Sequence, residues 1–171
     1  GKGDIQWSKR LVEETPERVT VELLAENVGP SDAPYSVRFH CSALAERKDA
    51  PIEVVVSGGG ENDAIELGVG MVTLPQERFL HDAQAGLMAS WGFQDVAIGT
   101  IGMGVIYPKD AFLRQVDLED QHQVILRIER GAPVHYHIHG NWLRGRRFPR
   151  CPTIDNWVEE LRASARMKKR D

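Results

Sequence analysis

The sequence predicts a mainly β protein, an antiparallel β-sandwich with one α-helix at its C-terminal end. Short segments that alternate apolar and polar residues recur along most of the chain, and turns rich in Gly, Pro, Asn and Asp separate them. Only the segment after Pro152 changes to helical spacing. The 171 residues are enough to bury a core, and their length predicts a single domain over residues 1–171.

The first two predicted strands are residues 19–23 and 35–41, whose side chains alternate between apolar and polar. Gly, Pro, Ser and Asp, which favour turns, stand between these two segments. We therefore expect a β-hairpin here. Further strands are expected at 52–56, 65–71, 85–92 and 96–107, with a flexible glycine-rich turn at 57–63.

Segment 96–107 is apolar on both faces and stops before Pro108, which is typical of a central strand. Its glycines, Gly99, Gly102 and Gly104, lack the strand-to-helix context of a dinucleotide-binding loop and the Lys-Ser/Thr end of a Walker loop. We interpret them as positions of close packing or bending, so nucleotide binding is not expected.

The C-terminal part contains two more strands and the helix. Residues 123–130 alternate, and a turn at 131–133 leads into the next strand, so these two strands are expected to pair. The helix is expected at about residues 154–167, with Thr153 or Asp155 as its N-cap. The apolar residues with the spacing i, i+3, i+4, i+7 are Ile154, Trp157, Val158 and Leu161.

Three of the six histidines, His135, His137 and His139, stand at alternate positions of the last predicted strand. Alternate side chains of a strand share a face, so the three imidazoles lie together. We expect this face to look into a cleft or solvent and the opposite face to enter the core. The residues of that opposite face are Val134, Tyr136 and Ile138.

A divalent metal is one interpretation of this row, although none is favoured. Residues two apart on a strand lie about 6.6–7 Å apart, so two neighbours such as His135 and His137 can share an ion but three cannot. At least one further ligand must come from another strand. The sequence does not select among the candidates, which are His40, His81, His122, Asp82 and several glutamates.

Without a metal, an imidazole with a pKa near 6.5 suits general acid–base chemistry or hydrogen bonding to sugar hydroxyls. We expect His137 to be the acid–base group, flanked by His135 and His139. An aromatic ring beside guanidinium groups fits a sugar that carries a carboxylate or sulfate, so Trp142 would stack on the ring and Arg144 or Arg146 would bind the anionic group. The alternatives are a metal-dependent enzyme and a non-catalytic accessory or structural module.

Charge is distributed unevenly along the chain. Residues 140–171 carry a net charge of +5, while the whole chain carries −4. An anionic ligand is drawn to the basic end, whereas the basic residues 168–170 are typical of a solvated tail. Nucleic acid is not expected, because the basic stretch lacks interleaved aromatic residues. No apolar run is long enough to cross a bilayer, so a membrane partner is not expected.

The two cysteines, Cys41 and Cys151, are too few for a thiolate zinc site and lie far apart in the sequence. They could form one disulfide in an oxidising compartment. Cys41 lies on the apolar register of its strand, which favours a buried free thiol.

An ordered series of short glycine and tryptophan motifs runs from Glu66 onward. Taken together, these motifs resemble the C-terminal half of the bacterial domain-of-unknown-function family 4861, and the resemblance covers most of residues 15–165. The motifs are Glu66-Leu67-Gly68-Val69-Gly70-Met71, Leu87-Met88-Ala89-Ser90-Trp91-Gly92, Ile101-Gly102-Met103-Gly104-Val105, Gly140-Asn141-Trp142, Phe148-Pro149 and Asn156-Trp157.

The resemblance implies a periplasmic or secreted protein of polysaccharide-degrading bacteria, with a β-sandwich similar to galactose-mutarotase-like domains. Family members are longer, which implies that this chain is a C-terminal part whose N-terminal part is a further partner. They are often encoded beside or fused to unsaturated-uronide hydrolases and lyases. An acidic, uronate-containing oligosaccharide or polysaccharide is therefore the implied partner, and glycoside hydrolase or polysaccharide lyase activity is the implied chemistry. The family supplies no catalytic residues, and the histidine row is not one of its hallmarks.

Overall fold

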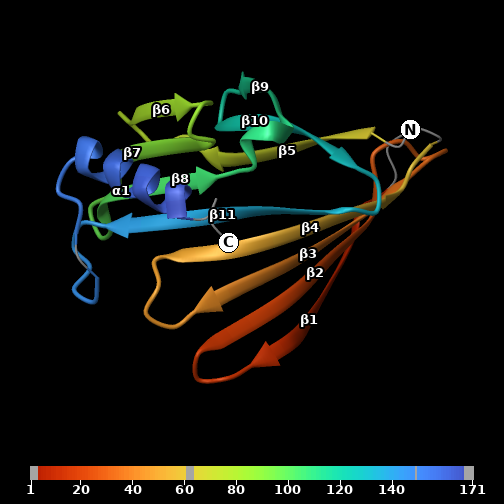
Figure 1. The fold of residues 1–171 in the computed structure, drawn as a ribbon, viewed down its shortest axis with the longest axis horizontal. Coiled ribbons are helices and arrows are strands. Elements are labelled where there is room, and N and C mark those ends of the chain that lie inside the picture. Colours follow the sequence, from red (N-terminus) through yellow and green to blue (C-terminus); the bar gives the residue numbers. More distant parts are fainter. Residues whose placement is uncertain (1–3, 61–63, 149, 168–171) are drawn as a thin grey trace. The chain divides into compact units, whose positions relative to one another are not determined.

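The structure is a computed structural model that describes residues 4–60, 64–148 and 150–167. The chain is mainly β, as predicted, with two antiparallel sheets consistent with a β-sandwich and one C-terminal helix, α1 (Ile154–Met167) (Figure 1). One sheet has the strand order β1-β2-β3-β4-β11-β8-β7-β6, and the other has the order β5-β10-β9. The strands are β1 Gln6–Glu14, β2 Arg18–Val28, β3 Tyr35–Leu44, β4 Asp49–Gly58, β5 Ala64–Val72, β6 Arg78–Asp82, β7 Leu87–Asp95, β8 Gly99–Ile106, β9 Phe112–Asp117, β10 Gln121–Glu129 and β11 Pro133–Trp142.

Contacts divide the chain into two compact units. Unit 1 comprises Gly1–Leu67 and Arg127–Tyr136, and unit 2 comprises Gly68–Leu126 and His137–Asp171. The chain passes between the units inside strands β5, β10 and β11. The boundary in β11 separates Tyr136 from His137, so it divides the histidine row.

In unit 1, the predicted hairpin is confirmed, because β2 and β3 pair antiparallel. Strand β4 continues the sheet, and Val37 of β3 lies opposite both Ala25 of β2 and Val56 of β4. These three side chains are buried and form part of the core of the unit. Because side chains alternate along a strand, the intervening residues form the opposite, polar face of the sheet.

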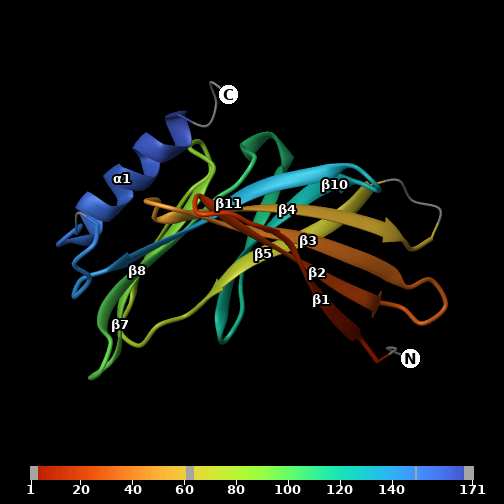
Figure 2. The same ribbon diagram turned by 90° about the horizontal axis from the view of Figure 1, so that it is seen from below.

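In unit 2, α1 lies against β7 and β8 (Figure 2). Gly102 and Gly104 of β8 lie beneath the helix, and a Cβ atom on either would come within 2.9 Å of Trp157 or Leu161. This confirms that these glycines serve close packing. Thr153 is the N-cap, since its Oγ1 accepts a hydrogen bond from the backbone N of Asn156 at 3.3 Å.

One predicted strand pairing is wrong. Strands β10 and β11 do not pair, because β10 lies between β5 and β9 while β11 lies between β4 and β8. The turn that joins them includes Gly131, which has a φ of 80° and donates its N–H to the carbonyl of Val56. The turn therefore directs the chain from one sheet into the other instead of closing a hairpin.

Strand β8 is confirmed as an interior strand of its sheet, flanked by β11 and β7. It begins at Gly99, because the preceding residues form a turn closed by a hydrogen bond from the Ile98 N–H to Asp95. Neither cysteine forms a disulfide; Cys151 is buried and Cys41 is partly buried. None of the described helices has the length and apolarity required to cross a membrane.

Candidate functional site

The histidines of β11 differ in their surroundings. His135, in unit 1, has 61% of its side chain exposed. His139, in unit 2, is 8% exposed, because its strand partner in β8 is Gly104 and α1 packs on this face. His137 is half-buried on the same face, and its ring centroid lies 6.4 Å from that of His139. Of the three histidines, only His135 thus has the exposed side chain that was expected for all of them.

The apolar face of β11 also changes its exposure along the strand. Val134 is buried and Tyr136 is half-buried in unit 1, where burial raises the pKa of Tyr136 to about 12. Ile138, in unit 2, is exposed, contrary to the prediction that this face enters the core throughout. The helix covers the histidine face at this end of the strand.

The predicted sugar-binding residues Trp142 and Arg144 hold a turn. The indole N–H of Trp142 donates to the carbonyl of Ile98 at 2.7 Å, although the side chain remains 51% exposed. Nη1 of Arg144 donates to the carbonyls of Val96 and Ala97 at 3.0 and 2.9 Å. Because Trp142 is an odd number of residues from the three histidines, it points to the other face of β11. Arg146 is exposed.

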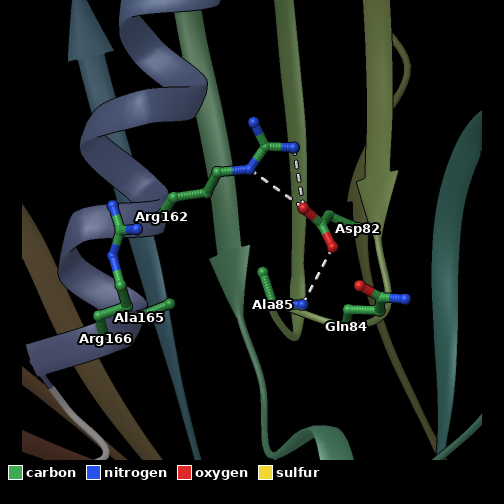
Figure 3. Close-up of a pocket in the computed structure, with 6 residues that line it drawn as sticks. All are labelled: Asp82, Gln84, Ala85, Arg162, Ala165 and Arg166. Carbon is green, nitrogen blue, oxygen red and sulfur yellow. Dashed lines mark hydrogen bonds and ion pairs between the residues drawn. The ribbon is translucent and has the colours of Figure 1, made fainter.

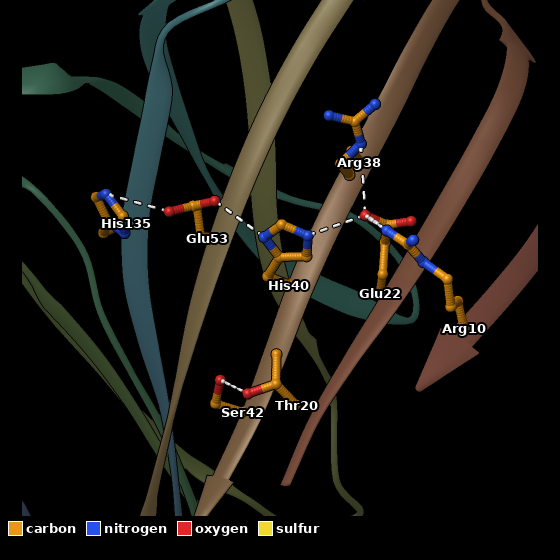
Figure 4. Close-up of polar contacts among 8 residues, drawn as sticks. All are labelled: Arg10, Thr20, Glu22, Arg38, His40, Ser42, Glu53 and His135. Carbon is orange, nitrogen blue, oxygen red and sulfur yellow. Dashed lines mark hydrogen bonds and ion pairs between the residues drawn. The ribbon is translucent and has the colours of Figure 1, made fainter. Parts of the chain in front are cut away.

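Unit 1 contains a polar row that crosses its sheet (Figure 4). His40 of β3 lies between Glu22 of β2 and Glu53 of β4, and each of its ring nitrogens is 3.0 Å from a carboxylate oxygen. The second oxygen of Glu53 lies 3.8 Å from Nε2 of His135. The strand register produces this line, because His40 is directly opposite both glutamates.

Two arginines flank the row at Glu22. Arg10 of β1 is opposite Glu22 in the register and donates to it at 3.1 Å. Nε of Arg38 lies 3.7 Å from the same carboxylate oxygen. The hydrogen bond to His40, followed by that from Arg10, lowers the pKa of Glu22. The row therefore presents alternating charges on a polar face.

His40 is held in its protonated form. Only an imidazolium can donate from both ring nitrogens, which is what two carboxylate neighbours require. The hydrogen bond to Glu22 is the main cause that raises the pKa of His40, and the bond to Glu53 adds to it against the opposing effect of burial. His40 therefore stabilises the folded protein most when it is charged.

We expect the replacement His40→Gln to destabilise the protein more at pH 5.5 than at pH 8.5. A raised pKa in the folded state stabilises fully below the unfolded value, about 6.5, and this contribution is lost as pH rises through the folded value. Urea unfolding of both proteins at the two pH values measures the difference. A cost that is equal at both pH values would show that the charge of His40 does not contribute.

Unit 2 also contains a histidine, His122, that lies between two carboxylates. Nε2 of His122 is 2.7 Å from Glu77, and Nδ1 is 2.7 Å from Asp117. The ring of Phe79 stacks on the imidazole with centroids 3.7 Å apart. Burial alone would lower the pKa of His122, but the hydrogen bonds to Asp117 and Glu77 outweigh it and raise the pKa.

Glu77 is the centre of this second network. Its carboxylate accepts hydrogen bonds from the hydroxyl of Ser90, which is fully buried, and from the backbone N of Leu74. Burial would raise the pKa of Glu77, but the bonds from Ser90 and His122 outweigh it and lower the pKa. Because these groups satisfy one another, the network is suited to joining strands and not to binding a ligand.

His81 is engaged in a similar way in unit 2. Its Nε2 lies 2.6 Å from the hydroxyl of Tyr107, and its ring is tilted against Phe112 with centroids 5.1 Å apart. Burial lowers the pKa of His81. The neutral ring can therefore accept a hydrogen bond from the hydroxyl of Tyr107, which is itself buried. Within residues 4–60, 64–148 and 150–167, no three His, Cys, Asp or Glu side chains are placed to hold a metal ion.

The sequence identified His40 as a polar strand residue but missed its partners Glu22 and Glu53. The predicted β2–β3 hairpin was the signal that could have identified Glu22, because the register of a hairpin determines which residues face one another. Glu77 and His122 carried no such signal, since they are 45 residues apart and not strand partners. The basic tail beyond residue 167 and Pro149 lie outside the described residues.

Comparison with known proteins identifies a family. No curated protein and no solved structure matches the chain significantly. The sequence model of a family described as a domain of unknown function, DUF4861, matches residues 6–168, nearly the whole chain. The chain therefore belongs to the DUF4861 family.

Proposed function

We propose that this chain binds or processes acidic, uronate-containing saccharides in polysaccharide breakdown, and that it does so on the polar face of unit 1. The observation that carries this proposal is the row of Glu22, His40, Glu53 and His135 across four strands (Figure 4). The size, the chemistry and the accessibility of this row all suit such a ligand.

The row has the dimensions of an extended ligand. Neighbouring strands are about 4.8 Å apart, so a line of side chains over four strands spans roughly 14 Å. Ionised carboxylates accept hydrogen bonds from hydroxyl groups and imidazoles can donate to them, which suits a chain of sugars. The row therefore offers repeated partners along a line instead of a single pocket.

Arginines give the face its preference for acidic ligands. Arg10 and Arg38 both approach Glu22, and each is more than half exposed. One carboxylate cannot neutralise two guanidinium groups. A ligand carboxylate can pair with the fork of either arginine, as arginine side chains favour.

In a processing reaction, His135 would be the acid–base group in place of His137. Its imidazole is accessible, and the carboxylate of Glu53, 3.8 Å from its Nε2, is near enough to orient it. Glu53 in turn touches His40, so the row is a connected set of ionisable groups. His137 lies on the face that α1 covers.

We expect His135→Ala to weaken the binding of a uronic-acid oligosaccharide about tenfold or more, because it removes the most exposed hydrogen-bonding group of the row. Calorimetric titration of the full chain measures this. His137→Ala is the matched control, since it removes the same side chain from the same strand, and it should bind like the wild type. Loss of binding in the control alone, or no heat with any anionic sugar, would contradict the proposal.

An activity assay distinguishes an enzyme from a non-catalytic binding module. If the domain is catalytic, turnover of unsaturated oligouronides should fall in Glu53→Gln while circular dichroism shows intact folding. If saccharide binds and no turnover is found in the wild type, the domain is a binding module. Metal analysis of protein purified without an affinity tag tests the metal-dependent alternative, which requires a stoichiometric ion.

A further inference from the structure

Unit 2 contains a small charged pocket between the C-terminal half of α1 and the turn that follows β6 (Figure 3). Its volume is about 270 Å³. The lining residues are Asp82, Gln84, Ala85, Arg162, Ala165 and Arg166. None of them belongs to the polar row of unit 1, so the pocket is independent of the function proposed above.

Asp82 is fully engaged within this pocket. Its Oδ2 accepts hydrogen bonds from Nε and Nη2 of Arg162 at 3.1 and 2.8 Å, and its Oδ1 accepts from the backbone N of Ala85 at 3.0 Å (Figure 3). The bond from Ala85 is the main cause that lowers the pKa of Asp82. The carboxylate is therefore ionised, and it balances the charge of Arg162.

Arg166 supplies the unbalanced charge of the pocket. It lies four residues after Arg162, which places both side chains on one face of the helix. In the part of the chain that the structure describes, no carboxylate forms an ion pair with Arg166. With Asp82 and Arg162 in balance, the pocket carries one net positive charge, and Nη1 of Arg162 is not used by Asp82.

We infer that this pocket binds a small hydroxylated carboxylate, such as a single sugar acid. Arg166 would pair with the carboxylate, Nη1 of Arg162 would donate a further hydrogen bond, and the amide of Gln84 would bind a hydroxyl group. The volume falls just below the usual range for drug-sized ligands, so it suits one ring or a short acid and not a chain. Ala85 and Ala165 are small and leave this space open.

Titration of the full chain with galacturonate and with neutral galactose tests the inference. We expect galacturonate to bind and galactose to bind at least about tenfold more weakly, because only the former offers a charge to Arg166. Arg166→Ala should weaken galacturonate binding about tenfold. Arg127→Ala, which removes an exposed arginine outside the pocket, should leave it unchanged.

Three results would overturn the inference: no binding of galacturonate, equal binding of the two sugars, or unchanged binding in Arg166→Ala. Loss of binding in His135→Ala with full binding in Arg166→Ala would assign the monosaccharide to unit 1 instead. Arg166 lies in the last turn of the helix and is exposed, so its removal should leave folding intact. Inorganic phosphate as a competitor shows whether the pocket selects carboxylates or accepts any small anion.

Discussion

Replacing Trp157 with alanine is expected to destabilise the protein by about 3–5 kcal/mol. The side chain is completely buried, and its indole N–H donates to the carbonyl of Met103 at 3.2 Å. The substitution removes the largest apolar group between α1 and the sheet of unit 2 and leaves a cavity beside Gly102. Because a domain is usually stable by only 5–15 kcal/mol, urea unfolding should shift strongly.

Trp142→Ala is the control for this prediction. It removes the same side chain and also breaks one indole hydrogen bond to a backbone carbonyl, but from a position that is half exposed. We expect its cost to be at most half that of Trp157→Ala. Equal costs for the two variants would show that packing of α1 on β8 is not a main source of stability.

Replacing Glu77 with alanine is the second change with a large expected effect, about 3–5 kcal/mol. Glu77 and His122 have only 11% and 14% of their side chains exposed, so removing one leaves the other charge largely buried. The hydroxyl of Ser90 and the backbone N–H of Leu74 lose their acceptor at the same time, which adds the cost of unsatisfied donors. Chemical denaturation near pH 7 measures the effect.

The pH dependence of this effect has a definite sign. The folded state lowers the pKa of Glu77, so its contribution is present above the unfolded value of about 4.3 and is lost as pH falls through the folded value. Asp117→Ala is the control, because Asp117 contacts the other ring nitrogen, Nδ1, of His122. Because 59% of the Asp117 side chain is exposed, we expect a cost of about 1 kcal/mol or less. A larger cost for Asp117→Ala than for Glu77→Ala would contradict this account of the network.

Local features of the fold were predictable from the sequence. The hairpin of β2 and β3 and the helix α1 depend on alternation, turn residues and helical spacing within short segments. Strands β1, β6 and β9 were missed, because Gln6–Glu14 is mostly polar and Arg78–Asp82 and Phe112–Asp117 are short. The pairing of β10 with β11 was predicted wrongly, because the partners of β11 come from segments far apart in the sequence.

The candidate site was predictable only in part. Alternation placed the histidines on one face of a strand, but it could not show that α1 covers His139 and leaves His135 open. That difference depends on which residues of β8 lie beneath the helix. The partner of His135, Glu53, likewise comes from β4, more than 80 residues earlier in the chain. Cross-strand register decides the composition of the row, and the sequence indicates it only where a predicted hairpin joins two strands.

Binding of an acidic saccharide along the polar row of unit 1 is tested most directly by an NMR titration with a uronic-acid trisaccharide. We predict that the largest shifts occur at the imidazole signals of His40 and His135 and at the backbone of β2, β3 and β4. Shifts confined to residues 142–148, or none at saturating ligand, would contradict it.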